Sequence, residues 1–175
     1  MDKNIESIIL KRINRTAENL RKNNMEFHYA ATKEDVVGIV ENLLNKGDVV
    51  THGGSVTLKQ CNIPDLLNSG DYKYIDRSAV SEDKLEQLYR ASFSADAYFT
   101  SANAITEDGI LYNVDGNSNR IAAIAYGPKS VIVVAGYNKI VKNLDEAVMR
   151  VKREAAPPNC ERLNKATPCY NTGEC

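Results

Sequence analysis

The sequence has no tryptophan, only two histidines and four cysteines, and no long apolar run. The longest such run, near residues 131–135, has the length of a strand and falls far short of the ~18 residues of a membrane-spanning helix. The amino terminus also lacks the apolar stretch of a secretory signal. The 22 lysines and arginines nearly balance the 23 aspartates and glutamates, so no excess of positive charge points to nucleic acid or to a membrane surface. These absences favour a cytoplasmic protein with neither partner.

The 175 residues are the length of one globular domain. We expect residues 1–156 to form a single α/β domain and residues 157–175 to form a tail that begins at two prolines. The last residue of this tail is a cysteine, which suggests that the tail is cut short.

Helical and strand patterns alternate along the whole chain. This order predicts right-handed crossovers and a three-layer α/β/α fold with a mainly parallel sheet. Ligands of such sheets bind beyond the carboxyl ends of the strands. We expect helices near residues 4–22, 32–47, 56–60, 64–67, 81–93, 119–126 and 143–151, and strands near residues 26–31, 48–51, 72–76, 97–101, 110–114 and 130–135.

The first candidate site is the loop that follows the strand 48–51. Gly53 and Gly54 let the backbone approach a ligand closely, and the hydroxyls of Ser55 and Thr57 add polar groups for an anion. The alternative is a tight turn that Ser55 caps. His52 is open to the same two interpretations, as a proton-transfer group or as a hydrogen-bonded structural residue.

The second candidate site is the polar segment 100–120. Its side chains offer donors, acceptors and carboxylates to a small polar molecule. Glu107 is the best candidate for a base or nucleophile, and Arg120 is suited to clamp a carboxylate or phosphate. In the alternative, residues 107–109 and 115–116 are solvated turns and Arg120 pairs with Asp115. The remaining predicted ligand-binding residues here are Asn103, Asn113, Asp115, Gly116 and Asn119.

The third feature is a group of three cysteines in the tail, Cys160, Cys169 and Cys175. Thiolates suit zinc or an iron–sulfur cluster, but this spacing matches no usual pattern and is one ligand short of a closed site. Cys61 lies in an apolar stretch and is expected in the core.

The series ITEDG, NVDGN and NR, together with the earlier HGGSVTL, closely resembles the LUD domain, named for lactate utilisation. The resemblance implies a fold like that of ribose-phosphate and glucosamine-phosphate isomerases and coenzyme A transferases (the NagB/RpiA/CoA-transferase-like group). It matches Gly53, Gly54 and Ser55 to an anion loop and likens Glu107 to the nucleophilic glutamate of coenzyme A transferases. It also associates the family with lactate oxidation alongside iron–sulfur partner proteins.

We therefore expect a protein that binds a small anionic metabolite at the strand ends and serves the utilisation of lactate or another 2-hydroxy acid. One alternative is an acyl- or coenzyme A-transferring enzyme that uses Glu107. Another is a non-catalytic electron-transfer or assembly subunit, associated with iron–sulfur proteins through its cysteine tail. A homodimer stays open, because the amphipathic first helix suits either a sheet or a second copy.

Overall fold

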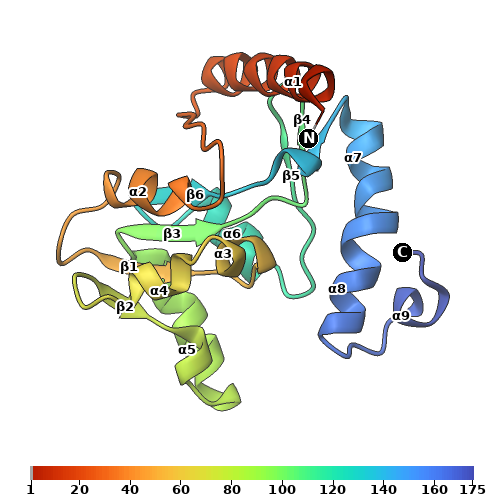
Figure 1. Cartoon of the computed structure of the whole chain (residues 1–175). Helices are drawn as coiled ribbons and strands as arrows, with labels where there is room; N and C mark the ends of the chain where they lie inside the picture. Colours follow the sequence, from red (N-terminus) through yellow and green to blue (C-terminus); the bar gives the residue numbers. More distant parts are fainter. Residues whose placement is uncertain (1) are drawn as a thin grey trace. The chain divides into compact units, whose positions relative to one another are not determined.

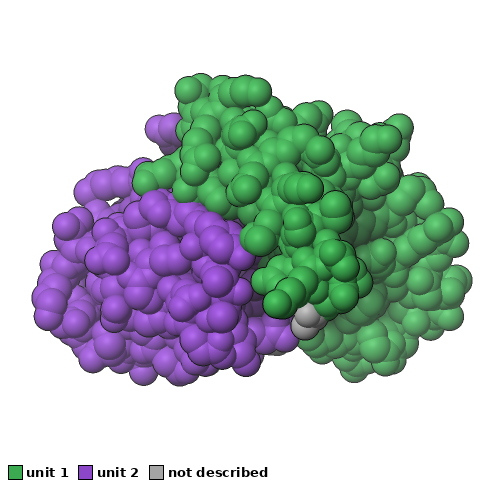
Figure 2. Space-filling view, turned by 45° about the horizontal axis from the view of Figure 1, so that its top comes forward, with its two compact units in different colours: residues 1–27, 102–114, 136–175 green, residues 28–101, 115–135 purple. Residues whose placement is uncertain are grey.

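The computed structural model describes residues 2–175, which divide into two compact units. Unit 1 takes in the residues up to Phe27, residues 102–114 and residues 136–175. Unit 2 takes in residues 28–101 and 115–135. Figure 2 colours unit 1 green and unit 2 purple.

Unit 2 is built on a four-stranded sheet with the order β2-β1-β3-β6, and every neighbouring pair in it is parallel. Its strands are β1 (Val49–His52), β2 (Lys73–Ile75), β3 (Ala97–Thr100) and β6 (Ser130–Val133). Its helices are α2 (Asp35–Glu41), α3 (Val56–Gln60), α4 (Ile63–Leu67), α5 (Leu85–Ala91) and α6 (Asn119–Ala125). Short 3-10 turns, η1 (Arg77–Ala79), η2 (Glu82–Lys84) and η3 (Ser92–Ser94), flank α5.

The core of unit 2 explains its layering (Figure 1). Val50 lies in register with Tyr74 and Ala97, and residues in register on parallel strands face the same side of a sheet. All three belong to a cluster that α2, α3 and α4 complete with apolar side chains, among them Leu58 and Leu67. Helix α6 packs against β3. The predicted mainly parallel, helix-flanked sheet is therefore confirmed.

Unit 1 holds a second, smaller sheet that the sequence did not predict. Strand β4 (Ala104–Thr106) pairs with β5 (Leu111–Tyr112) in antiparallel and with β7 (Ile140–Val141) in parallel. The long helix α1 (Lys3–Lys22) begins at Asp2, whose carboxylate accepts hydrogen bonds from the N–H groups of Asn4 and Ile5. The unit is completed by η4 (Tyr137–Lys139), α7 (Leu144–Arg150), a π-helical turn (Val151–Ala155), α8 (Ala156–Arg162) and α9 (Pro168–Thr172).

Several predicted boundaries were wrong. Residues 26–31 form no strand, because neither described sheet includes them. Helix α2 begins only at Asp35, since the Asp35 carboxylate accepts hydrogen bonds from the N–H and hydroxyl of Thr32 and Thr32 does not cap the helix.

The helical segment that begins at Leu144 runs past residue 151, where the prediction ended it, and past the two prolines (Figure 1). It widens into the π-helical turn and continues as α8, with Pro157 and Pro158 in its first turn. Proline lacks an N–H and its ring crowds the carbonyl four residues earlier. In the π-helical turn the hydrogen bonds run to the fifth preceding residue instead of the fourth, and this wider turn lies directly before the two prolines. Residues 157–175 belong to unit 1.

Among the helices of residues 2–175, none combines the length and the apolar character that crossing a bilayer requires.

Candidate functional site

In unit 2, the backbone after β1 turns at Gly53 and Gly54 and enters α3 at Ser55. The Gly53 N–H donates to the carbonyl of Phe99 at 2.9 Å, so strand pairing extends one residue past β1. The Ser55 hydroxyl accepts a hydrogen bond from the Leu58 N–H at 3.3 Å. Ser55 therefore caps α3, as the structural alternative predicted.

Both glycines of this loop have close side-chain neighbours. A Cβ atom on Gly53 would lie 2.5 Å from the Tyr98 hydroxyl oxygen, and one on Gly54 would lie 3.2 Å from Nη1 of Arg77. Neither glycine has a positive φ. The Tyr98 hydroxyl and the Arg77 guanidinium therefore lie directly against the main chain of this loop.

Arg77 is the residue that sequence reasoning missed. It follows β2, as the loop 53–55 follows β1, and the carboxyl ends of parallel strands share one sheet edge. Its guanidinium lies 5.7 Å from the centre of the Tyr89 ring, and Nη2 donates a long hydrogen bond of 3.4 Å to the Tyr89 hydroxyl. Among the side chains that the structure describes, no carboxylate pairs with Arg77.

Arg120, in contrast, is fixed by Asp115. Its Nε and Nη2 each lie 2.8 Å from Oδ1 of Asp115, and its Nη1 donates to the carbonyl of Ser101 at 2.9 Å. The Asp115 carboxylate also accepts from the Ile121 N–H at 2.7 Å, within the first turn of α6. The predicted Asp115–Arg120 pair is confirmed. A Cβ on Gly53 would lie 3.5 Å from Cδ of Arg120, which places this pair beside the loop.

Two further groups flank the loop. Burial raises the pKa of Tyr98 to about 12 against the opposing charge of Arg120, so the phenol stays neutral and able to donate. The His52 ring stacks on Tyr74, with centroids 5.9 Å apart, and its Nδ1 lies 2.7 Å from the Gly53 carbonyl oxygen. This contact matches the structural interpretation of His52.

Asp76 adds a carboxylate that stays ionised. Burial alone would raise the pKa of Asp76, but hydrogen bonds from the backbone and hydroxyl of Ser78, together with the charge of His52, lower it overall.

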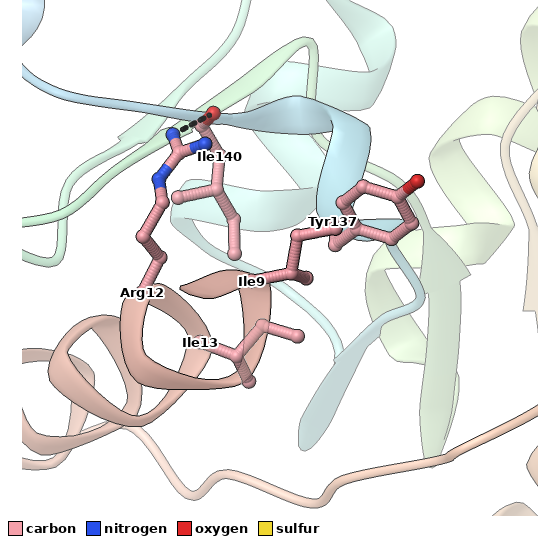
Figure 3. Close-up of a pocket in the computed structure, with 5 residues that line it drawn as sticks. All are labelled: Ile9, Arg12, Ile13, Tyr137 and Ile140. Atoms are coloured by element: carbon pink, nitrogen blue, oxygen red, sulfur yellow. Dashed lines mark hydrogen bonds between the residues drawn. The ribbon is translucent and has the colours of Figure 1, made fainter. Parts of the chain in front are cut away.

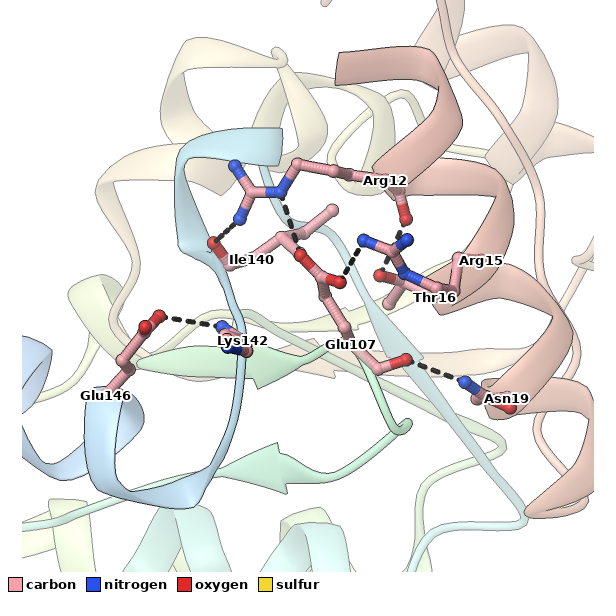
Figure 4. Close-up of polar contacts among 8 residues, drawn as sticks. All are labelled: Arg12, Arg15, Thr16, Asn19, Glu107, Ile140, Lys142 and Glu146. Atoms are coloured by element: carbon pink, nitrogen blue, oxygen red, sulfur yellow. Dashed lines mark hydrogen bonds and ion pairs between the residues drawn. The ribbon is translucent and has the colours of Figure 1, made fainter. Parts of the chain in front are cut away.

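In unit 1, residues 107–109 form a turn that Arg12, Arg15 and Asn19 of α1 hold (Figure 4). Arg12 Nε donates to Oε1 of Glu107 at 2.9 Å, and Arg15 forms an ion pair with Oε2. Burial alone would raise the pKa of Glu107, but the hydrogen bonds from Arg12 and Arg15 lower it. The carboxylate therefore stays charged, with both of its oxygens engaged by guanidinium groups.

The backbone of the same turn is also bound by α1. The Asn19 amide donates to the Glu107 carbonyl at 2.8 Å, and the Asn23 amide donates to the Gly109 carbonyl at 3.0 Å. Gly109 has φ +89°, and a Cβ there would lie 2.8 Å from the backbone carbonyl of Asn19. This segment is a helix-docking turn, so the alternative interpretation of residues 107–109 as a solvated turn was wrong.

Asn103, just before β4, and Asn113, just after β5, are linked through their side chains. The Asn113 side-chain oxygen accepts from the Asn103 N–H at 3.4 Å, and the Asn103 side-chain oxygen accepts from the Val114 N–H at 2.9 Å. Arg150 donates to the Asn103 carbonyl. The two amides thus join the ends of the β4–β5 hairpin, and Arg150 ties this hairpin to α7.

The predicted ligand-binding and catalytic residues divide between the two units. Asn103, Glu107 and Asn113 lie in unit 1. Those of unit 2 are Gly53, Gly54, Ser55, Thr57, Asp115, Gly116, Asn119 and Arg120. Of these, Thr57 lies in α3, Asn119 begins α6, and Gly116 has open space around it. The catalytic role of Glu107 stays a prediction. In the structure its carboxylate binds Arg12 and Arg15 and so helps to hold α1 against the turn.

Unit 1 also has a shallow hollow between α1 and the segment that leads into β7 (Figure 3). Ile9, Ile13, Ile140 and Tyr137 line it with apolar surface, and Arg12 is its charged group. Arg12 Nη2 donates to the Ile140 carbonyl at 3.0 Å, so this charge is already used in packing. We therefore assign the hollow no binding role.

The three tail cysteines are the thiols that the sequence offers to a metal or cluster. Cys160 and Cys169 lie with their sulfur atoms 3.5 Å apart. Across residues 2–175, however, no three His, Cys, Asp or Glu side chains are arranged to hold a metal ion. Three thiols also leave a tetrahedral site one ligand short. The residues present therefore do not fit a closed site. Cys61 is buried in the core of unit 2, as predicted.

Comparison with known proteins identifies a family and a similar solved structure. No curated protein matches the sequence. The crystal structure of eIF2B beta from Chaetomium thermophilum is similar over 65% of this chain and 44% of that chain, with 16% identity and a TM-score of 0.44. The chain thus spans less than half the length of that protein. The LUD domain model matches residues 13–175. It covers nearly the whole chain, including both glycine turns and the cysteine tail, and so the chain belongs to the LUD domain family, whose name refers to lactate utilisation.

Proposed function

We propose that unit 2 binds a small anionic metabolite at the carboxyl edge of its parallel sheet and serves the utilisation of lactate or a related 2-hydroxy acid. The observation that carries this proposal is Arg77, a guanidinium that has no carboxylate partner among the described side chains and stands against the backbone of Gly54. A planar guanidinium binds a carboxylate through two parallel hydrogen bonds.

The charges around the loop support an anion. Asp115 neutralises Arg120 and fixes its position. Of the two guanidinium groups that the structure describes beside the loop, Arg77 is therefore the one without a carboxylate partner. The neutral Tyr98 hydroxyl beside Gly53 offers a donor for a second oxygen. A 2-hydroxy acid carries a carboxylate and an adjacent hydroxyl, and this pairing suits one cation with one neutral polar group.

Acyl transfer through Glu107 gains no support from the contacts of that residue. Its carboxylate is held by Arg12 and Arg15, which withdraw electron density from the oxygens that a nucleophile must offer.

The test is calorimetric titration of the full chain with lactate, pyruvate, a phosphosugar and coenzyme A. We expect lactate or pyruvate to bind, and Arg77→Ala to weaken that binding by about tenfold or more, since a hydrogen bond to a charged group contributes roughly 1.5–3 kcal/mol. Arg77→Lys keeps the charge without the planar fork and is expected to lie in between.

Arg90 offers a matched control. It is an arginine of the same unit, on α5, with an exposed side chain paired to Glu86 four residues earlier. Arg90→Ala should leave affinity unchanged. The proposal fails if the unaltered chain binds none of the four compounds at millimolar concentration, or if Arg77→Ala binds as tightly as Arg90→Ala.

A further inference from the structure

Two helices of the carboxyl-terminal segment bring two cysteines into contact. Cys160 lies in α8 and Cys169 in α9, and their sulfur atoms are 3.5 Å apart. The chain between them is held in a tight turn, in which the Lys165 N–H donates to the Cys160 carbonyl at 3.0 Å. The contact therefore rests on local backbone hydrogen bonds.

The surroundings of Cys169 favour its thiolate. The Thr167 hydroxyl lies 3.2 Å from the Cys169 sulfur. Hydrogen bonds from Thr167, Cys160 and Cys175 lower the pKa of the Cys169 thiol, although burial opposes them. A thiolate, and not a thiol, is the form that attacks an oxidant.

Cys175 completes the group as an exposed third thiol. Its N–H donates to the carbonyl of Lys152 at 3.0 Å, which returns the end of the described chain to the π-helical turn. Cys61 is a fourth thiol of different character, since it is buried in the core of unit 2. Cys61 therefore serves as an internal control for the reactivity of the tail thiols.

We propose that Cys160 and Cys169 form a reversible disulfide when a hydroperoxide oxidises the protein. The Cys169 thiolate attacks one peroxide oxygen, the O–O bond breaks, and a sulfenic acid and hydroxide (or alkoxide) are produced. The Cys160 thiol then attacks the sulfenic sulfur, and its proton and the sulfenic hydroxyl leave as water. The two sulfurs lose two electrons in total, and the peroxide gains them.

The geometry favours this bond over a metal. The two sulfur atoms are already in contact and need to close only to the ~2.05 Å of a disulfide, whereas a tetrahedral metal needs four ligands placed around it. The bond would join α8 to α9. A dithiol reductant reverses it by thiol–disulfide exchange.

The experiment treats the reduced full chain with stoichiometric hydrogen peroxide and measures intact mass, peptide linkage and free thiols. We expect a loss of two hydrogens, a linked pair of peptides that contain Cys160 and Cys169, and full recovery of the four thiols after a dithiol is added. Cys160→Ser should stop the reaction at a Cys169 sulfenic acid, which dimedone traps. Cys175→Ser and Cys61→Ser are controls that should still form the bond.

Three results would overturn the proposal. One is a chain that keeps its mass under peroxide, and another is a disulfide that links a different pair. The third is a reduced chain that binds zinc or iron with one ion per chain and resists peroxide while loaded, because that result assigns the same thiols to a metal.

Discussion

The docking turn of unit 1 (residues 107–109) and the loop 53–55 of unit 2 contain similar residue types but differ in whether the nearby arginines are paired with carboxylates. Each is a glycine-containing turn next to two arginines. In unit 1, Arg12 and Arg15 both pair with Glu107. In unit 2, Arg120 pairs with Asp115, whereas Arg77 has no carboxylate partner among the described side chains. Arginine beside glycine therefore does not by itself indicate a binding site. What distinguishes the two places is whether the protein has already supplied the anion.

The largest expected effect is on the docking turn. Gly109→Ala places a Cβ 2.8 Å from the backbone of Asn19 at a residue with φ +89°. Because the backbone of α1 cannot retreat without losing its hydrogen bonds to the turn, we expect the free energy of unfolding to fall by about 3 kcal/mol. Chemical denaturation measures this change. Gly116→Ala is the matched control, since Gly116 has open space and no positive φ. Equal losses in the two variants would contradict the assigned role of the turn.

The next effect sharpens the description of the loop in unit 2. Gly53→Ala brings a Cβ within 2.5 Å of the buried Tyr98 hydroxyl oxygen, and we expect a loss of roughly 1–3 kcal/mol from overpacking. Tyr98→Phe removes that oxygen, after which the nearest ring atom lies 3.4 Å away. The double variant should therefore be more stable than the sum of the two single changes predicts, as a double-mutant cycle measures. Additive losses would show that the glycine does not serve this contact.

The smallest effect tests the charge of the docking turn. Glu107→Gln removes the anion that Arg12 and Arg15 share, and we expect about 1–2 kcal/mol less stability at neutral pH. The folded pKa of Glu107 lies below its ordinary value of 4.5. Its contribution is therefore complete above pH 4.5 and is lost as the pH falls through the folded value. The difference between variant and unaltered protein should shrink with acidification. A difference that stays constant from pH 7 to pH 3 would argue against an ionic role.

Sequence patterns predicted unit 2 better than unit 1 for a physical reason. The strands of unit 2 are apolar runs such as residues 130–133, which pair in parallel and are separated by helices. Those of unit 1 are two or three residues long, and β7, which pairs with β4, lies far from it in the chain. Thr106, for example, lies in register with Val141. A pattern that short carries no periodicity, so the second sheet depended on contacts that local sequence does not encode.

The candidate site was predictable in part. The strand-end rule located Gly53 and Gly54, and charge and spacing gave the pair of Asp115 and Arg120. The same rule applied to the strand at residues 73–75 would also have indicated Arg77. The pairing of Glu107 with Arg12 could not be predicted from local sequence, because Arg12 lies 95 residues earlier, on the first helix. Only a tertiary structure shows that this carboxylate is occupied.

The segmented layout of unit 1 has a consequence for how the protein emerges from the ribosome. Helix α1 is made well before the groups that hold it: Glu107 is 95 residues and the Ile140 carbonyl 128 residues downstream of Arg12. Unit 2 is complete once residue 135 has left the ribosomal exit tunnel. We expect nascent chains halted at this stage to protect the four-stranded sheet from proteases while the amphipathic first helix stays open to cleavage.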